Sequence, residues 1–193
     1  MKKLLILVIT ILFAFTPIDN KSDRIGIAGP FKFNKTKFEL KWANKPNDNY
    51  YIQEYLPADE SPESFNQMLT CHLFITDLSV KEAVQLKTKE LDERKKTDAI
   101  CNYLVNESPD GKEFMVDFLL GESKDSKMTI AEFNVYRYKK VKINRKTNGI
   151  LVFAYSKRSY GDDITAFLKG LGKERINHLT EMIAFDTPKV KMK

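Results

Sequence analysis

Four carboxylates lie close together between residues 54 and 63, and a pair of carboxylates can act as the general acid and general base of a hydrolysis. They are Glu54, Asp59, Glu60 and Glu63. A structural interpretation fits the same residues, because acidic side chains are common in turns and stabilise the N-terminal end of a helix. The cluster is therefore a candidate for acid–base chemistry, and its members are equally candidates for turn and helix-start residues.

A second candidate is the pair formed by Cys71 and His178, in which the imidazole could activate the thiol as a nucleophile. His72 is the only other histidine, and it cannot serve Cys71 because neighbouring residues of a strand point to opposite faces. The sequence contains no HExxH, CxxC or GxSxG motif and no metal-ligand spacing. We accordingly assign no catalytic, cofactor-binding or metal-binding residue, and we predict no cofactor.

The elements that would position these residues can be read from the local pattern. Tyr50–Leu56 reads as a strand that ends at Pro57. Ser61 is placed to cap a helix, Pro62 suits the first helical position, and apolar residues follow at helical spacing. These apolar residues are Phe65, Met68 and Leu69. We therefore expect a strand, a turn, a short helix, and a return to strand over residues 71–76.

The remaining pattern predicts an α+β fold. Residues 31–42 alternate as a half-buried strand, and Ser79 with Glu82 forms a capping box before an amphipathic helix. From residue 99 to residue 156, strands follow one another across short turns, which predicts an antiparallel meander. A last helix begins at Asp162 or Asp163, with a break near residues 170–172. We expect a meander sheet flanked by helices. The alternative is a cystatin-like fold, in which a curved sheet wraps one helix.

The N-terminus has the pattern of an export signal. Two lysines precede the run Leu4–Phe15, whose apolar character only Thr10 interrupts. A membrane-spanning helix needs about 20 apolar residues, and this run ends well before that. We expect a signal peptide over 1–20, a flexible arm over 21–30, a single α+β domain over 31–186 and a loose tail over 187–193. The mature chain is then exported, to the periplasm or the medium, with no transmembrane span.

Export affects the expected oxidation state of the two cysteines, Cys71 and Cys101. An oxidising compartment permits a disulfide between them. Both also lie in apolar strand-like runs, where free cysteine is a common small core residue. The sequence leaves both possibilities open, because a disulfide needs the two Cα atoms within about 7 Å.

Charge is unevenly distributed along the chain, whose net charge is +6. Residues 46–80 contain six acids and no lysine or arginine, whereas residues 133–161 contain eight cations and no acid. Most of these cations fall on a predicted hairpin, and those selected as candidate binding residues are Arg137, Lys139, Lys140, Lys142, Arg145 and Lys146. Such a hairpin could bind an acidic protein or an anionic envelope surface. The cations could equally protect a sheet edge from aggregation.

One segment resembles a stretch found in small exported bacterial proteins of uncharacterised function, in which a strand end meets an acidic turn. The residues that carry the resemblance are Glu54, Tyr55, Pro57, Glu60, Phe65, Met68, Leu69 and Thr70. The order of elements over residues 31–186 also looks like the PsbP-like α/β/α sandwich. The resemblance implies an accessory or binding role and transfers no catalytic residue to this chain.

These observations predict an exported, soluble, non-catalytic binding or accessory domain of the cell envelope. Export makes nucleic acid an unlikely partner. The alternative is a small envelope hydrolase that uses Cys71 with His178, or the carboxylates between Glu54 and Glu63. A pocket that joins these groups would favour the enzyme, whereas a filled core beneath charge-divided faces would favour the binding domain.

Overall fold

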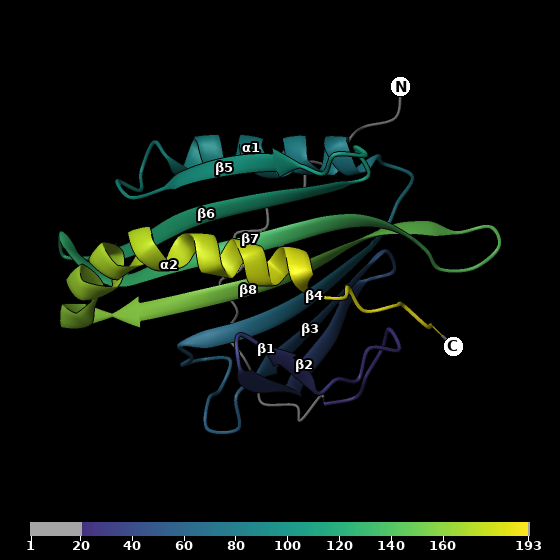
Figure 1. Cartoon of the computed structure of the whole chain (residues 1–193), viewed down its shortest axis with the longest axis horizontal. Helices are drawn as coiled ribbons and strands as arrows, with labels where there is room; N and C mark the ends of the chain where they lie inside the picture. The colour runs from purple at the N-terminus through teal and green to yellow at the C-terminus, as the bar shows by residue number, and fades with distance from the viewer. Residues whose placement is uncertain (1–20, 193) are drawn as a thin grey trace.

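The computed structural model describes residues 21–192, so the predicted signal peptide lies outside the described residues. Its framework is an eight-stranded antiparallel sheet with the strand order β1-β2-β3-β4-β8-β7-β6-β5 (Figure 1). Two four-stranded meanders make up this sheet, and they meet where β4 pairs with β8. The predicted antiparallel meander is confirmed for the second half of the chain, and the first half repeats the arrangement.

The strands of the first meander are β1 (Phe31–Phe33), β2 (Thr36–Asn47), β3 (Tyr50–Leu56) and β4 (Gln67–Ile75). Helix α1 (Val80–Arg94) then crosses to the far edge of the sheet. There the second meander begins, with β5 (Asn102–Glu107), β6 (Glu113–Lys124), β7 (Lys127–Lys142) and β8 (Asn148–Tyr160). A short 3-10 turn, η1 (Gly161–Asp163), leads into helix α2 (Ile164–Ala184).

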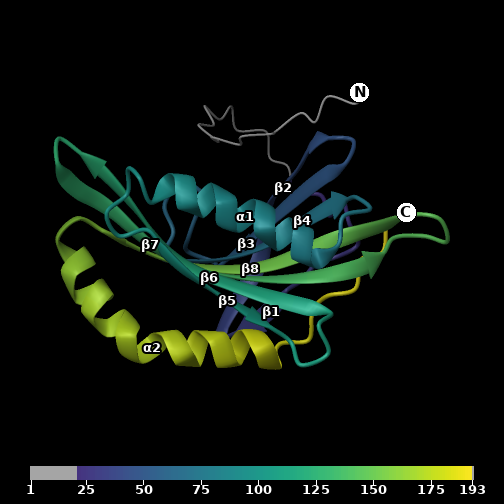
Figure 2. The same cartoon turned by 90° about the horizontal axis from the view of Figure 1, so that it is seen from above.

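The two helices cover opposite faces of the sheet, as the view from above shows (Figure 2). Each helix closes its own hydrophobic core. The α1 side is built on Val84, Val116 and Val152, and the α2 side on Phe153 and Leu179. This arrangement confirms the α+β class with helices flanking the sheet. It differs from the cystatin-like alternative, in which the sheet wraps a single helix. Within residues 21–192, neither helix combines the length and apolar character that a membrane crossing requires.

The helix expected after Ser61 is absent, and that prediction was wrong. Residues 57–66 form a turn-rich loop, and β4 begins at Gln67. Leu69, Cys71 and Leu73 alternate into the core on the α2 side. Helical and strand spacing are hard to distinguish in so short an apolar run. The strand prevails because β3 and β8 satisfy the backbone of β4 on both sides.

The alternating stretch 31–42 is two strands rather than one. Asn34 and Lys35 both have positive φ, 47° and 65°, so the chain reverses there and pairs Phe31 with Phe38. A two-residue turn with both central residues at positive φ matches the twist of a hairpin, and Asn tolerates that conformation well. The same device, at Asp125 and Ser126, joins β6 to β7.

Both long helices begin where the sequence predicts. Ser79 and Glu82 form the complete capping box of α1, with each side chain bonded to the other residue's backbone N–H. Asp163 occupies the N-cap position of α2, but its side chain makes no capping hydrogen bond. The predicted break near residues 170–172 is wrong, since α2 runs unbroken through both glycines. Figure 2 shows that the helix bends along its course.

The predicted flexible arm and loose tail are instead packed against the sheet. Ile25 and Ile27 are buried, and Ile27 O accepts hydrogen bonds from Gln53 Nε2 and the Tyr55 hydroxyl. The backbone N–H of Lys191 donates to Ile25 O at 2.9 Å, which ties the tail to the arm. Glycine and proline indicated breaks in regular structure correctly, but irregular backbone can still be buried when side chains such as Gln53 supply its hydrogen bonds.

We predict that Ile25→Ala lowers the free energy of unfolding by about 3 kcal/mol, because it leaves a cavity in the core. Leu86→Ala is the matched control. Leu86 is 58% exposed on α1, so its truncation should change stability by no more than about 0.5 kcal/mol. Urea unfolding measures both. Equal effects of the two substitutions would show that Ile25 does not belong to the core.

Candidate functional site

The six predicted binding cations belong to the β7–β8 hairpin, which extends beyond the neighbouring strands (Figure 1). They do not form one surface. The structure separates them into three residues that already have intramolecular partners and three that have none within residues 21–192. This division follows from their position relative to the end of α2 and the start of α1.

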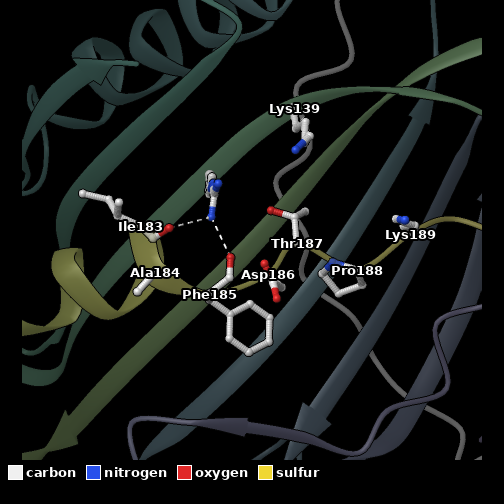
Figure 3. Close-up of a pocket in the computed structure, with 9 residues that line it drawn as sticks. Lys139, Ile183, Ala184, Phe185, Asp186, Thr187, Pro188 and Lys189 are labelled. Carbon is white, nitrogen blue, oxygen red and sulfur yellow. Dashed lines mark hydrogen bonds between the residues drawn. The ribbon is translucent and has the colours of Figure 1, made fainter. Parts of the chain in front are cut away.

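Arg137 organises the end of α2. Its Nε donates to Glu113 Oε2 at 2.7 Å. Its Nη1 donates to three main-chain oxygens at the helix C-terminus, those of Met182, Ile183 and Phe185. Figure 3 shows Ile183 and Phe185 at this end of the helix. The last carbonyls of a helix lack partners within the helix and carry partial negative charge, so an arginine there both bonds and neutralises them.

Lys139 and Lys140 are also engaged. Lys139 Nζ lies 2.7 Å from Glu113 Oε1, so Glu113 bridges this lysine and Arg137. Lys140, whose alternating position places it on the opposite face, donates to Thr76 O and Leu78 O in the segment that enters α1. The hairpin therefore contacts the end of one helix and the start of the other.

Lys142, Arg145 and Lys146 differ from these three, and we call them the basic tip. All three are exposed. Within residues 21–192, no hydrogen bond or ion pair engages their side-chain nitrogens. The turn that carries them is ordered by Asn144, whose Oδ1 accepts the backbone N–H groups of Lys146 and Thr147, both at 2.9 Å. The hairpin thus holds, on a defined turn, three cations that no described residue neutralises.

An open pocket of about 590 Å³ lies at the base of this hairpin, between β7 and the segment that follows α2 (Figure 3). Its lining includes Arg137, Lys139, Asp186 and Lys189. The Oγ1 atom of Thr187 is buried there without a hydrogen-bond partner. Arg137 and Lys139 are already paired with Glu113, so the pocket carries less free positive charge than the tip.

The structure gives little support to a cysteine nucleophile. Cys71 is fully buried on the α2 side, and burial raises the pKa of its thiol to about 12. The thiolate, which is the nucleophilic form, is therefore scarce at neutral pH. His178 is buried against the rings of Phe133 and Tyr155, and burial lowers its pKa. Neither residue lines the pocket described above.

The two cysteines are free. Cys71 belongs to the core beneath α2, whereas Cys101 belongs to the core beneath α1. Because the sheet lies between these cores, the geometry does not favour the disulfide that the sequence left open.

The carboxylates between residues 54 and 63 have different environments and different roles in the structure. Glu60 Oε2 accepts the backbone N–H groups of Asn66 and Gln67, which braces the loop before β4. Asp59 is exposed. Glu54 lies on β3 and is partly exposed; burial and the nearby Glu63 raise its pKa to about 7. A carboxyl group with a pKa near 7 is suited to acid–base exchange at neutral pH.

Sequence analysis missed a polar group on the α1 side of the sheet next to Glu54. Glu132 and Arg158 form an ion pair there, with Nη2 and Oε2 at 2.5 Å. The Ser156 hydroxyl donates to Asn134 Oδ1 at 2.6 Å, and Asn134 Nδ2 is buried without a partner. The signal was available, because Glu132 and Asn134 are two residues apart in a predicted strand, so their polar side chains share one face. Across residues 21–192, no group of three or more His, Cys, Asp or Glu side chains could hold a metal ion.

We predict that Arg137→Gln lowers the free energy of unfolding by about 2 kcal/mol, because it leaves the carbonyls at the end of α2 without their charged donor. Arg145→Gln is the matched control at the tip and should cost no more than about 0.5 kcal/mol. Denaturant unfolding followed by helix circular dichroism measures both changes. A tip variant as unstable as the Arg137 variant would contradict the division between paired and free cations.

We also predict a pH-dependent effect of Glu54→Gln. The pKa of Glu54 is about 7 in the folded protein, against an ordinary value of 4.5. Between these pH values the folded state keeps a proton that the unfolded state has lost. The Glu54 contribution therefore lowers the free energy of unfolding as pH rises through this range, by about 3 kcal/mol in all.

The glutamine variant should accordingly gain stability over the wild type as pH rises from 4 to 8. The pKa of His72 is lowered by burial to about 3, so its contribution to stability rises with pH up to about 6.5. Subtracting the variant's unfolding curve from that of the wild type cancels the effect of His72. A difference that does not vary with pH would show that Glu54 titrates normally.

Comparison with known proteins places the chain in a family without assigning it a function. No curated protein matches it, and no solved structure does. The PsbP-like resemblance therefore stays a prediction, although the helix–sheet–helix layering is observed. A protein-family model, that of an uncharacterised family, matches residues 25–187. Because this match covers most of the chain, the protein belongs to that family of small proteins of unknown function.

Proposed function

We propose that this protein is an exported, non-catalytic binding domain of the cell envelope that binds an acidic protein through its basic tip. The observation that carries the proposal is an ordered turn of the protruding β7–β8 hairpin. It holds three cations, Lys142, Arg145 and Lys146, that have no partner in the part of the chain that the structure describes. Export rests on the N-terminal pattern of Lys2, Lys3 and the apolar run that follows.

The contrast within the hairpin supports a binding role for the tip. Arg137, Lys139 and Lys140 each complete a structural interaction, so the fold accounts for them. The tip cations complete none within the described residues. The tip turn lies at the end of the hairpin rather than along the sheet edge, which β5 occupies on that side. Edge protection, the alternative explanation for these cations, therefore applies poorly to the tip.

Charge arithmetic favours an acidic protein over a lipid surface. A cation near an anionic membrane contributes about 1 kcal/mol, and lipid-binding clusters usually contain four to eight cations. Three cations on one narrow turn would hold the domain only weakly on a flat surface. An acidic site on a protein can instead surround the turn, where desolvated ion pairs give specificity and fast association.

Several observations support a role without catalysis. The Cys71 thiol is buried with a raised pKa, and His178 is enclosed by aromatic rings. The feature that favours the alternative hydrolase is Glu54, with its pKa near 7. Neither the hairpin pocket nor a smaller pocket beside Phe31 is lined by Glu54, Cys71 or His178. A substrate-sized cavity around the candidate catalytic groups is what the hydrolase would need.

We predict that neutralising the tip abolishes binding to acidic protein. The test variant is Lys142→Gln, Arg145→Gln and Lys146→Gln combined. The control removes the same charge from exposed helix positions, with Lys81→Gln, Lys89→Gln and Lys173→Gln. Binding to immobilised poly-glutamate should weaken at least tenfold for the tip variant and less than threefold for the control, and wild-type binding should weaken with added salt.

The same three proteins are then crosslinked in an envelope fraction and compared with binding to vesicles of anionic phospholipid. An acidic envelope protein that the wild type and the control capture, and the tip variant loses, supports the proposal. Equal capture by all three proteins contradicts it. Tip-dependent binding to vesicles without binding to poly-glutamate would replace the acidic protein with a lipid surface.

A further inference from the structure

Among the described residues 21–192, strand β5 is an open edge of the sheet. It pairs with β6 on one side, and it is the last strand in the sheet order. Along its other side, the edge of a strand presents N–H and C=O groups that can pair with another strand. Figure 1 shows β5 at the outer margin of the sheet, with α2 lying over β7 and β8.

The two edges of the sheet differ in how they are protected. The opposite edge is a short hairpin carrying Lys32, Lys35 and Lys37, and the register between β2 and β3 is irregular. Lysines, short strands and bulges are the usual devices that prevent edge pairing. The β5 sequence, NYLVNE, contains no lysine, arginine or proline, and its register with β6 is continuous.

Exposed aliphatic side chains gather at this edge. Leu104 is 55% exposed and Val105 is 41% exposed. Leu104 lies on the α2 side, since its partner Asp117 forms an ion pair with Arg175 of α2. Val105 and Tyr103 lie on the α1 side, where the Tyr103 hydroxyl donates to Asp92 of α1.

Helix α2 adds two more exposed aliphatic residues, Ile176 and Ile183, which are 58% and 62% exposed. Their spacing of seven places them on one stripe of the helix. Arg175 contacts Asp117 of β6, whereas Glu174 contacts Lys157 of β8, so the two flanks of α2 face different strands. By helical geometry the isoleucine stripe lies on the β6 flank, toward the open edge.

We propose that β5 pairs with β5 of a second copy of this chain, in antiparallel register about Leu104, to make a two-fold symmetric dimer with a continuous sheet. An antiparallel pair keeps each residue opposite one that points to the same face. In this register Leu104 faces Leu104, Tyr103 faces Val105, and Asn102 faces Asn106. The apolar residues thus pair with one another, as do the amides.

The self-complementarity of this register is the argument for a second copy rather than a foreign peptide. A two-fold interface uses the same patch twice, so the patch must match itself. Glu107 would lie opposite Cys101, and no like charges would face each other across the strand pair. The alternative register, centred on Val105, would place Leu104 opposite Asn106 and Tyr103 opposite Glu107, which loses the apolar pairs.

The first test is the mass of the protein in solution by light scattering, across a range of concentrations. The wild type should approach twice the mass of the single chain. Leu104→Lys should remain monomeric, because the symmetry axis brings the two lysines together. Leu86→Lys adds the same charge at a position 58% exposed on α1, and it should still dimerise. Circular dichroism checks that each variant is folded.

The second test fixes the register by oxidative crosslinking. Residues opposite one another in an antiparallel pair have Cα atoms about 4.5 or 5.5 Å apart, within the range of a disulfide. Leu104→Cys should therefore link two chains, whereas Val105→Cys and Leu86→Cys should not, and the buried native cysteines of the wild type should not either.

A wild type that stays monomeric at the highest concentration tested would overturn the proposal, as would a dimer that survives Leu104→Lys. Crosslinking through Val105→Cys in place of Leu104→Cys would overturn the register. If Leu104→Lys fails to fold, the cysteine series decides alone. None of these experiments changes the basic tip. They therefore test the dimer independently of the proposed binding function.

Discussion

The pairing of β4 with β8 is the interaction on which the rest of the structure depends. Every residue of β4, from Gln67 to Ile75, has a partner in β8. This ladder joins two meanders that are distant in sequence into one sheet. Without it, each meander would expose a long central edge. With it, each face of the sheet is wide enough to seat a helix, and β4 and β8 contribute to both hydrophobic cores.

The joined sheet explains why charge in the sequence is a poor guide to free charge on the surface. Arg137 and Lys140 are three residues apart on the same strand, yet Arg137 bonds to the C-terminal end of α2 and Lys140 to the segment that enters α1. Arg137 donates to carbonyls at the C-terminus of α2, which have no partner within the helix. Lys140 donates instead to carbonyls of the segment that precedes α1. The cations of the basic tip lie beyond the segments that pack against the hairpin. Within the described residues, they are therefore the hairpin cations left to bind another molecule. Glu113 also neutralises part of this charge, because it forms ion pairs with both Arg137 and Lys139.

Burial also determines the hydrogen bonds and the pKa values of the polar residues on β3. Gln53 and Tyr55 are fully buried, but their hydrogen bonds to Ile27 anchor the N-terminal segment across the sheet. Glu54, between them in sequence, points to the opposite face and has a pKa near 7 because burial and Glu63 oppose its ionisation. Adjacent residues of one strand therefore serve the core and a polar cluster, since their side chains alternate between faces.

The sequence by itself determined the features that depend on near neighbours: the α+β class, the capping box at Ser79, the meander after residue 99, and the basic run between residues 133 and 161. Local propensity and charge suffice for these. Tertiary structure alone decided that residues 67–70 are strand rather than helix and that Ile25 and Ile27 belong to the core. It also decided which of the six hairpin cations have partners among the described residues. Each depends on a partner far along the chain, such as β8 for β4, Gln53 for Ile27 and the end of α2 for Arg137. No local pattern specifies such a partner, because it is the packing of the whole sheet that brings the two segments together.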